Sequence, residues 1–391
     1  MRPLSATVRA LEESGTLALT REARDMRARG IDVVAMTAGE PDLPPPPHVG
    51  DAAIRAIREN FTRYTATEGI AELRDAVVGK FARDNGIRIA PEAVMVSAGA
   101  KYCVAATLQA LCGPGDEVIV VAPYWVSYPS LIRLTGAIPR VVATTSAEGY
   151  RFPAGALERA VTPKTRAILV NSPCNPTGAV LREPELQTLA RIAARHDLTV
   201  ISDEVYETMV FDGRVHRSLA SLPEMADRVV TISSVSKSYA MPGWRIGYMT
   251  GPPEVIAAAL TIQGHTLTCP SGIAQKAAAA ALSGPQEFAR EMGAVFEQRR
   301  DIAFELLSGI PGLPVTPPEG AMFFFLDVRG FLREGESDLD LARGLLSRHR
   351  VGLVPGSAFG EPGRLRLSFS LPEPLLREGI RRLSTGLRER R

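Results

Sequence analysis

The chain has 391 residues, 45% of them hydrophobic and 23% charged, and its formal net charge is +2. This composition is that of a folded globular protein rather than a disordered one, and the length favours two domains or one large α/β unit over a single ordinary core. A near-neutral charge excludes a strongly basic surface, so we expect neither nucleic acid nor a membrane as a partner.

The first 45 residues contain a helical pattern over 16–30, a strand pattern over 32–37 and a proline run over 44–47. The proline run is a rigid connector and the earliest candidate for a domain boundary. Residues 1–45 hold too little apolar sequence to form a core alone. We therefore expect this N-terminal segment to pack with another domain.

From residue 46 to residue 285, short apolar runs alternate with helical patterns. Strands are predicted at 93–96, 117–122, 138–143, 166–170, 199–202, 229–232 and 245–249. Helices are predicted at 48–59, 71–85, 101–111, 125–135, 153–160, 184–196, 253–262 and 273–281. This alternation is typical of a mostly parallel sheet that helices cover on both faces.

A long helical pattern over 286–307 leaves this unit, and the segments after it predict a small α+β domain. The expected fold class is thus α/β. Residues 46–285 would form the large domain with a seven-stranded sheet, and residues 286–391 the smaller domain, to which the N-terminal segment adds. No internal repeat or low-complexity linker interrupts the chain.

Cysteines and histidines give no sign of a metal site. Cysteines at 103, 112, 174 and 269 form no CxxC pair, and the histidines are scattered. Neither a zinc site nor a disulfide framework is predicted. The start of the chain carries charges and lacks the apolar core of a secretory signal, and no apolar run is long enough to span a bilayer. We therefore expect a reduced, cytoplasmic compartment.

Lys237 has an unusual setting. It follows the predicted buried strand over 229–232 and stands in a loop rich in Ser, Gly and Pro. An amine in such a place can be partly desolvated, which lowers its pKa and lets it form a Schiff base with a carbonyl. A lysine that snorkels to solvent from a strand end is the structural alternative.

Other polar residues stand at successive strand ends, which is where open parallel α/β sheets bind ligands. Each has a structural alternative: Asp203 as a helix N-cap, Asn175 as a turn residue, Gly99 as a tight turn and Arg245 as a surface ion pair. Pro176, beside Asn175, is a candidate for a cis bond. Together these residues supply every group that one cofactor requires, which favours a shared site.

Three motifs carry a resemblance to a known family. They are Asn-x-Pro-x-Asn-Pro-Thr-Gly over 171–178, Ser-Asp-Glu-Val-Tyr over 202–206, and Ser-x-Ser-Lys over 234–237 with Arg245 after it. In order and spacing they resemble the fold-type-I aminotransferases that use pyridoxal 5′-phosphate (PLP). Two more stretches, 38–42 and 123–129, are similar to the bacterial aspartate aminotransferase branch.

The resemblance implies a role for each residue around the cofactor ring. Lys237 would bind the cofactor covalently and then move the proton of the substrate Cα. Asp203 would pair with the pyridine nitrogen and keep it protonated. Tyr206 and Asn175 would hydrogen-bond the phenolic oxygen, and Trp125 would stack on the ring.

The resemblance also implies a phosphate site and a shared active site. The phosphate would be held by the Gly99 turn and the backbone N–H groups of Ala100 and Lys101, where a helix begins, and by Ser234, Ser236 and Arg245. Tyr64 matches the tyrosine that reaches the phosphate from a neighbouring subunit. A homodimer is therefore implied.

Substrate recognition is implied for fewer residues. Arg366 matches the arginine that clamps the substrate α-carboxylate, a bidentate task that lysine performs poorly. A cross-strand ion pair is its structural alternative. Gly39 and Asn175 would complete that carboxylate site beside Trp125. Lys101 stands where aspartate enzymes carry a lysine for the substrate side-chain carboxylate, whereas a solvent-facing lysine is the alternative.

The expected activity is a ping-pong transfer of an amino group from an L-amino acid, aspartate above all, to a 2-oxo acid such as 2-oxoglutarate. The same fold and cofactor also serve other amino donors, and lyases, decarboxylases or oxidases. A binding module that keeps the fold as a sensor is a different class. It would need an added DNA-binding domain, for which two domains leave no room, and it would not need Lys237, Asp203 and Arg366 together.

Overall fold

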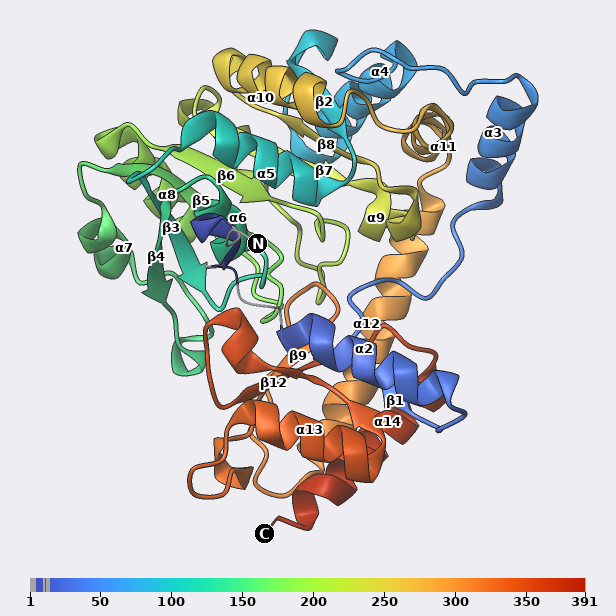
Figure 1. Ribbon diagram of the computed structural model, residues 1–391, viewed down its shortest axis with the longest axis vertical. Helices are drawn as coiled ribbons and strands as arrows, with labels where there is room; N and C mark the ends of the chain where they lie inside the picture. Colours follow the sequence, from blue (N-terminus) through green and yellow to red (C-terminus); the bar gives the residue numbers. More distant parts are fainter. Residues whose placement is uncertain (1–4, 10, 12–14, 391) are drawn as a thin grey trace.

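The computed structural model describes residues 5–9, 11 and 15–390. Two lobes are visible in Figure 1, an upper one built on a large sheet and a lower one that holds the C-terminal end. No helix among the described residues has the length and apolarity that crossing a membrane requires.

The upper lobe contains a seven-stranded sheet in the order β2-β8-β7-β6-β5-β3-β4. The sheet is mostly parallel, as predicted, and only β8 runs antiparallel to its neighbours β2 and β7. The strands are β2 (Val94–Ser97), β3 (Glu117–Ala122), β4 (Ile138–Ala143), β5 (Thr165–Asn171), β6 (Thr199–Asp203), β7 (Val229–Ser234) and β8 (Gly247–Thr250).

Helices cover both faces of this sheet because successive strand residues point to opposite sides. Val118 and Val120 of β3 pack in one layer, whereas Ile119 packs in the other. The first layer includes α5 (Ala100–Leu111), α6 (Tyr128–Leu134) and α10 (Pro253–Thr266). The second includes α3 (Pro47–Arg58), α4 (Ala71–Lys80), α7 (Ala154–Ala160), α8 (Glu183–His196) and α11 (Gly272–Ser283).

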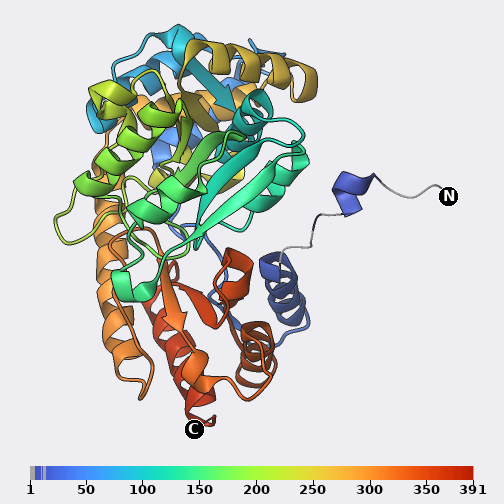
Figure 2. The same ribbon diagram turned by 90° about the vertical axis from the view of Figure 1, so that its left-hand side faces the viewer.

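The lower lobe is joined to the upper one by the long helix α12 (Glu287–Ser308), which Figure 2 shows along one side of the molecule. An antiparallel sheet β11-β12-β9 lies at its centre. Its strands are β9 (Phe323–Asp327), β11 (Val354–Pro355) and β12 (Arg364–Ser368), flanked by α13 (Asp338–His349) and α14 (Glu373–Arg388).

The N-terminal segment packs with this lower lobe. Helix α2 (Gly15–Ala28) and strand β1 (Val34–Ala35) lie beside it in Figure 1, and β1 pairs with β10 (Val351–Gly352). Leu19 and Met36 share one apolar core with Phe324 and Leu383. The boundaries expected after residues 45 and 285 stay a prediction, and both fall just before a helix begins.

Several predicted elements differ in their ends. Lys237 lies in the one-turn helix α9 (Val235–Ser238) rather than in a loop, because Ser234 caps the turn by accepting a hydrogen bond from the backbone of Ser236. The strand expected from Arg245 begins at Gly247, since Arg245 itself has a left-handed backbone with φ 56°.

Two helices also begin or end differently. The helix expected over 125–135 is shorter and begins at Tyr128, where Pro129 occupies the first turn. The helix expected over 71–85 continues after Lys80 as a π-turn over Phe81–Asn85. The Asn175–Pro176 bond is cis, as predicted, and so are the Ala122–Pro123 and Ser172–Pro173 bonds.

Candidate active site

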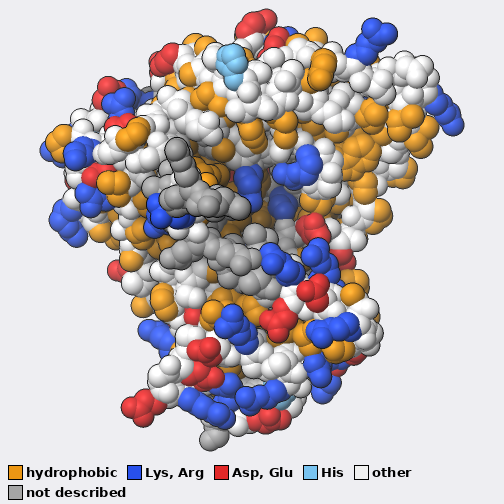
Figure 3. Space-filling model, in the orientation of Figure 1, with side chains coloured by type: hydrophobic (Ala, Val, Ile, Leu, Met, Phe, Trp, Pro, Cys, Tyr) orange, Lys and Arg blue, Asp and Glu red, His pale blue; other side chains and the backbone are white. Residues whose placement is uncertain are grey.

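A cavity of about 530 Å³ lies between the two lobes, where the carboxyl ends of β5, β6 and β7 meet the N-terminus of α5. Figure 3 shows Lys and Arg side chains around the hollow at this level. Its lining includes residues from the N-terminal segment and from the lower lobe, among them Gly39 and Arg366. Strand ends of a parallel sheet thus form one wall of a cleft that both lobes close.

Lys237 projects into this cleft from α9. Its Nζ donates a hydrogen bond to the backbone oxygen of Gly39 and lies 5.7 Å from the centre of the Tyr206 ring. Burial lowers the pKa of Lys237 to about 8, with the positive charges of Arg366 and Arg245 acting in the same direction. The uncharged form, which a nucleophile or general base requires, is therefore far more populated near neutral pH than for an ordinary lysine.

Asp203 ends β6 and faces the same cleft. Its Oδ2 accepts a hydrogen bond from the hydroxyl of Tyr128 at 2.7 Å, and its Oδ1 accepts one from the backbone N–H of Val205 at 3.4 Å. Burial raises the pKa of Asp203 to about 6. A buried carboxylate without a paired cation is costly unless a ligand brings one. Asp203 is thus suited to a ligand with a positively charged group.

The segment from Asn171 to Gly178 forms a second wall. Asn171 holds it in place by donating from Nδ2 to the backbone oxygen of Asp203 at 2.9 Å and accepting from the backbone N–H of Asn175 at 2.8 Å. Asn175 also hydrogen-bonds Tyr206, although burial keeps the pKa of that phenol raised. Asn175 and Tyr206 are therefore held side by side opposite Lys237.

The turn between β2 and α5 forms a cup for an anion. Gly99 has φ 91°, and a side chain there would collide with the guanidinium of Arg245. Ala100 and Lys101, which begin α5, line the cavity together with Ser234 and Ser236. Backbone N–H groups, hydroxyls and a guanidinium form the donor set that a phosphate prefers.

Arg366 of β12 enters the cleft from the lower lobe. Its Nη1 donates to Oδ1 of Asn175 at 2.9 Å and its Nη2 donates to the backbone oxygen of Thr37 at 2.8 Å. Its Nε is buried without a hydrogen-bond partner, and no carboxylate among the described residues forms an ion pair with it. Burial lowers the pKa of Arg366 to about 10. The cross-strand ion pair considered as its alternative is absent from the part of the chain that is described.

Lys101 and Trp125 lie together at the mouth of the cleft, with Nζ of Lys101 4.9 Å from the centre of the Trp125 ring. Partial burial and the charge of Arg245 lower the pKa of Lys101. Two predicted site residues do not line this cavity: Gly99, which directly precedes the lining residue Ala100, and Tyr64, which is 88% exposed.

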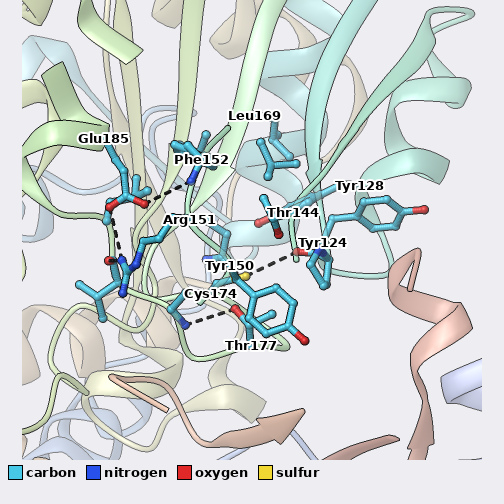
Figure 4. A pocket seen from close by; sticks show the side chains of 17 residues that line it. Tyr124, Tyr128, Thr144, Tyr150, Arg151, Phe152, Leu169, Cys174, Thr177 and Glu185 are labelled. Carbon is cyan, nitrogen blue, oxygen red and sulfur yellow. Dashed lines mark hydrogen bonds and ion pairs between the residues drawn. The ribbon is translucent and has the colours of Figure 1, made fainter. Parts of the chain in front are cut away.

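A smaller pocket of about 40 Å³ is lined in part by the Asn171–Gly178 segment (Figure 4). Its lining includes Tyr124, Tyr150 and Cys174, and the thiol of Cys174 lies 3.6 Å from the backbone oxygen of Pro123. A volume of this size accommodates about a water molecule and no cofactor. The cavity between the lobes is therefore the candidate active site.

Among the lining residues that sequence reasoning missed, three make hydrogen bonds to predicted site residues: Tyr128, Asn171 through its side chain, and Thr37 through its backbone oxygen. Tyr128 lies in the stretch 123–129 that carried part of the family resemblance, and this stretch was the available signal. Thr37 had none, because any residue type supplies a backbone oxygen.

Comparison with known proteins gives consistent results. The family model described as "Aminotransferase class I and II" matches residues 31–383. The chain is 40% identical to an aspartate aminotransferase of Geobacillus stearothermophilus, over 97% of this chain and 98% of that one. It is also 40% identical to an aspartate/prephenate aminotransferase of Cereibacter sphaeroides, over 97% of each.

A solved structure of a Thermus thermophilus aspartate aminotransferase with maleate superimposes with a TM-score of 0.93 at 39% identity. The alignment covers 99% of this chain and 100% of that chain. Sequence and fold agree along almost the whole length. The chain belongs to the class I and II aminotransferase family, as the three motifs had indicated.

Proposed function

We propose that this protein is a PLP-dependent aminotransferase that transfers the amino group of L-aspartate to a 2-oxo acid, 2-oxoglutarate above all. The observation that carries the proposal is the pair formed by Lys237 and Asp203 in one buried cleft. A desolvated amine and a buried carboxyl without a paired cation are what a pyridine aldehyde needs at its two ends.

The residues of the cleft fit PLP in three ways. A side chain at Gly99 would collide with Arg245, and the first residues of α5, Ala100 and Lys101, line the cavity directly after it. The buried Asp203 carboxyl lies at a different part of the same cavity. The buried Nε of Arg366 is a hydrogen-bond donor that has no partner among the described residues. A phosphate, a pyridine nitrogen and a substrate carboxylate supply the missing partners.

When bound, PLP supplies an electron sink for the bond that breaks at the substrate Cα. Asp203 would hold the ring nitrogen in its protonated form, and Tyr128 would orient that carboxylate. Tyr206 and Asn175 would donate to the phenolic oxygen. Ser234, Ser236 and Arg245 would hold the phosphate together with the α5 N-terminus.

Lys237 would carry out the proton transfer. Its amine would bind the cofactor aldehyde in the resting enzyme and, once free, would take the Cα proton of the substrate. Trp125 would cover one face of the ring and help to exclude water. The lowered pKa of Lys237, about 8, leaves the amine able to accept a proton near neutral pH.

Arg366 would hold the substrate α-carboxylate, with Asn175 and the backbone of Gly39 beside it. Lys101 would meet the side-chain carboxylate of aspartate at the other end of the substrate. The Thermus thermophilus relative was solved with maleate, a dicarboxylate, and this supports a site with two separate cations. A relative named for prephenate supports some breadth in the oxo acid.

The visible absorption spectrum of the purified protein tests this proposal directly. A band of bound PLP should change to that of the amine form when L-aspartate is added, and 2-oxoglutarate should restore it. A band that aspartate leaves unchanged would keep the cofactor and remove aspartate as donor. No band, even after PLP is added, would contradict the whole proposal.

Lys101→Ala tests the recognition of the acidic side chain. We expect kcat/KM for aspartate to fall by roughly 10-fold or more, as for one lost charge-assisted hydrogen bond. The kcat/KM for alanine, which has no second carboxylate, should change little. Equal losses for both donors would mean that Lys101 serves the phosphate site or the fold instead.

We also propose a homodimer with shared active sites, and a cytoplasmic location. Figure 3 shows an apolar surface at the right of the upper lobe. Ile54 at 47% and Ile57 at 56% exposure lie on α3, and Tyr64 at 88% exposure follows that helix in the chain. Large apolar side chains gathered on a surface are typical of an interface. Tyr64 would then reach the phosphate site of the second copy.

Mixing two inactive variants tests the shared site. In a hybrid of Tyr64→Ala and Lys237→Ala subunits, one of the two sites has both native residues, and the other lacks both. Activity should therefore rise well above that of either variant alone after the subunits are exchanged. Sedimentation should give the mass of a dimer. No gain from mixing would place Tyr64 outside the site.

A further inference from the structure

A buried polar cluster lies behind Asp203, away from the cleft. It consists of Lys80, Asn85, Glu204, Glu207 and His216, which we call the rear cluster. The side chain of Lys80 is 2% exposed and that of His216 is 6% exposed. None of the five lines the cavity between the lobes. Their chemistry is unused by the reaction proposed above, yet burying several charges is costly.

Glu204 is the centre of one half of the rear cluster. Its Oε1 accepts hydrogen bonds from the hydroxyls of Ser202 at 2.8 Å and Ser218 at 2.9 Å. Its Oε2 accepts from Nδ2 of Asn85 at 3.2 Å and lies 2.9 Å from Nε2 of His216. Among the described residues, every hydrogen-bond partner of Glu204 except His216 is neutral, so His216 is the partner that can balance the charge of Glu204.

Glu207 is the centre of the other half. Its Oε1 is 2.6 Å from Nζ of Lys80 and accepts from the hydroxyl of Ser233 at 2.7 Å. Its Oε2 accepts from Nδ2 of Asn85 at 2.7 Å. Asn85 lies five residues after Lys80, at the end of the π-turn. Nζ of Lys80 donates a hydrogen bond to Oδ1 of Asn85 at 2.5 Å. Lys80 thus balances Glu207 and is not available to Glu204.

The charges of the rear cluster therefore cancel only when His216 is an imidazolium. Burial lowers the pKa of His216, and Lys80 acts in the same direction, but the charges of Glu204 and Glu207 outweigh both and raise it. Glu204, Glu207 and Lys80 are the charged groups that act on the imidazole among the described residues. The charge balance favours a protonated His216 whose Nε2 donates to Glu204, while the buried Nδ1 has no hydrogen-bond partner among the described residues.

The rear cluster reaches the active site through the backbone. Glu204 follows Asp203 directly, and successive residues at a strand end point to opposite faces, so one carboxylate faces the cleft and the other the cluster. Burial raises the pKa of Asp203, and the negative charge of Glu204 raises it further. A Glu204 left without a cation would disfavour the ionised form of Asp203.

We propose that His216 is a positioning residue that, paired as an imidazolium with Glu204, keeps Asp203 charged and in place for the pyridine nitrogen of the cofactor. The inference rests on the proposed function, because it needs a pyridine ring at Asp203. It assigns to His216 an effect on cofactor binding without any contact to the cofactor.

A metal-binding site is the alternative interpretation of the rear cluster. Ligand atoms of Glu204, Glu207 and His216 all lie within 4.8 Å of one another. The amide Nδ2 of Asn85, however, donates to both carboxylates, and Lys80 binds one of them. Hydrogen-bond donors already fill the position between the carboxylates that a cation would occupy. The cluster is therefore better described as a balanced ion-pair network.

Binding of two probes to the apoprotein tests the inference. One probe is PLP, and the other is its analogue with carbon in place of the ring nitrogen, which cannot pair with Asp203. The variants are H216Q, which keeps a hydrogen-bond donor without the charge, and H216Q/E204Q, which removes both charges. H196Q is the matched control, because His196 forms a partly exposed pair with Glu158 at 2.7 Å.

H216Q should weaken PLP binding by roughly tenfold, as for a shift of one pKa unit at Asp203, and leave the analogue almost unaffected. H216Q/E204Q should bind PLP nearly as well as the native protein, since the uncompensated charge is gone. H196Q should change neither probe. Equal losses for both probes in H216Q, no loss at all, or no recovery in the double variant would overturn the inference.

A measurement on the native protein covers the case in which H216Q fails to fold. In the apoprotein with ¹³C-labelled histidine, the signal of His216 is the one that E204Q shifts most. Its pKa should lie above the ordinary value of about 6.5 and fall in E204Q. The imidazolium is present below that raised pKa, so preference for PLP over the analogue should be lost as pH rises through it.

A His216 that is neutral below its ordinary pKa would overturn the inference. Failure of the proposed function has a different signature, because the native apoprotein would then bind neither PLP nor its analogue. If the native protein binds PLP and aspartate changes its spectrum, but H216Q shows no selective loss, only the inference about His216 fails.

Discussion

Lys237→Ala is expected to lose at least roughly 10³-fold in kcat, because the variant lacks the group that moves the substrate proton. The variant should still bind PLP, although more weakly, because the groups proposed to hold the phosphate remain in the cleft together with Asp203 and Trp125. The measurement is turnover with L-aspartate and 2-oxoglutarate, with the absorbance of bound cofactor followed in parallel. Added small primary amines should restore part of the rate.

The matched control for this variant is Lys164→Ala, which removes an exposed lysine remote from the cleft. It should leave kcat within about twofold of the native value, as surface substitutions usually do. Near-normal turnover in Lys237→Ala would contradict the mechanism. A loss of turnover with complete loss of PLP binding and of folding would move Lys237 into a structural role.

Arg366→Lys is expected to raise KM for aspartate by about 10²-fold, while kcat changes much less. Two charge-assisted hydrogen bonds in a fork are worth about 2–3 kcal/mol more than a single point contact, and 1.4 kcal/mol is a factor of ten. The contact to the α-carboxylate exists in both the ground state and the transition state, so its loss affects KM. Steady-state kinetics with varied aspartate measures both constants.

The chain offers a close control on the same strand. Arg364 of β12 is also buried, but it pairs with Asp327 at 2.8 Å and Glu361 at 2.9 Å outside the cleft. Arg364→Lys should lower the stability of the fold and leave KM for aspartate within a few-fold. If both variants lost stability and neither changed KM, Arg366 would serve the packing of the two lobes and not the substrate.

The secondary structure and the cofactor side of the site could be predicted from local patterns. The apolar runs before Asp203 and Lys237 predicted buried strands, and the polar residues after them were expected at one edge of the sheet. That expectation needs only the rule for parallel strands, and both residues do line one cavity. The one-turn helix around Lys237 was missed, because a four-residue turn is decided by a single capping hydroxyl at Ser234.

Local sequence patterns could not predict the contacts between segments that lie far apart in the chain. Tyr128 meets Asp203 across 75 positions of the chain, and Arg366 meets the backbone of Thr37 across 329. Neither contact produces a periodic pattern in the sequence around its residues, because each depends on how two separate elements pack. The resemblance to a family predicted the role of Arg366, whereas the residues alone allowed an ion pair equally well.

The sequence by itself thus determined the alternation of strands and helices and the order of the strand-end motifs, and its resemblance to a family predicted the groups that would hold the cofactor. Only the tertiary structure decided that Tyr128 supports Asp203 and that His216 lies behind it with Glu204. The physical reason is the range of the forces involved. Strand and helix patterns arise from neighbouring residues, whereas the protonation of a buried side chain depends on every charge that the fold brings within a few ångströms of it.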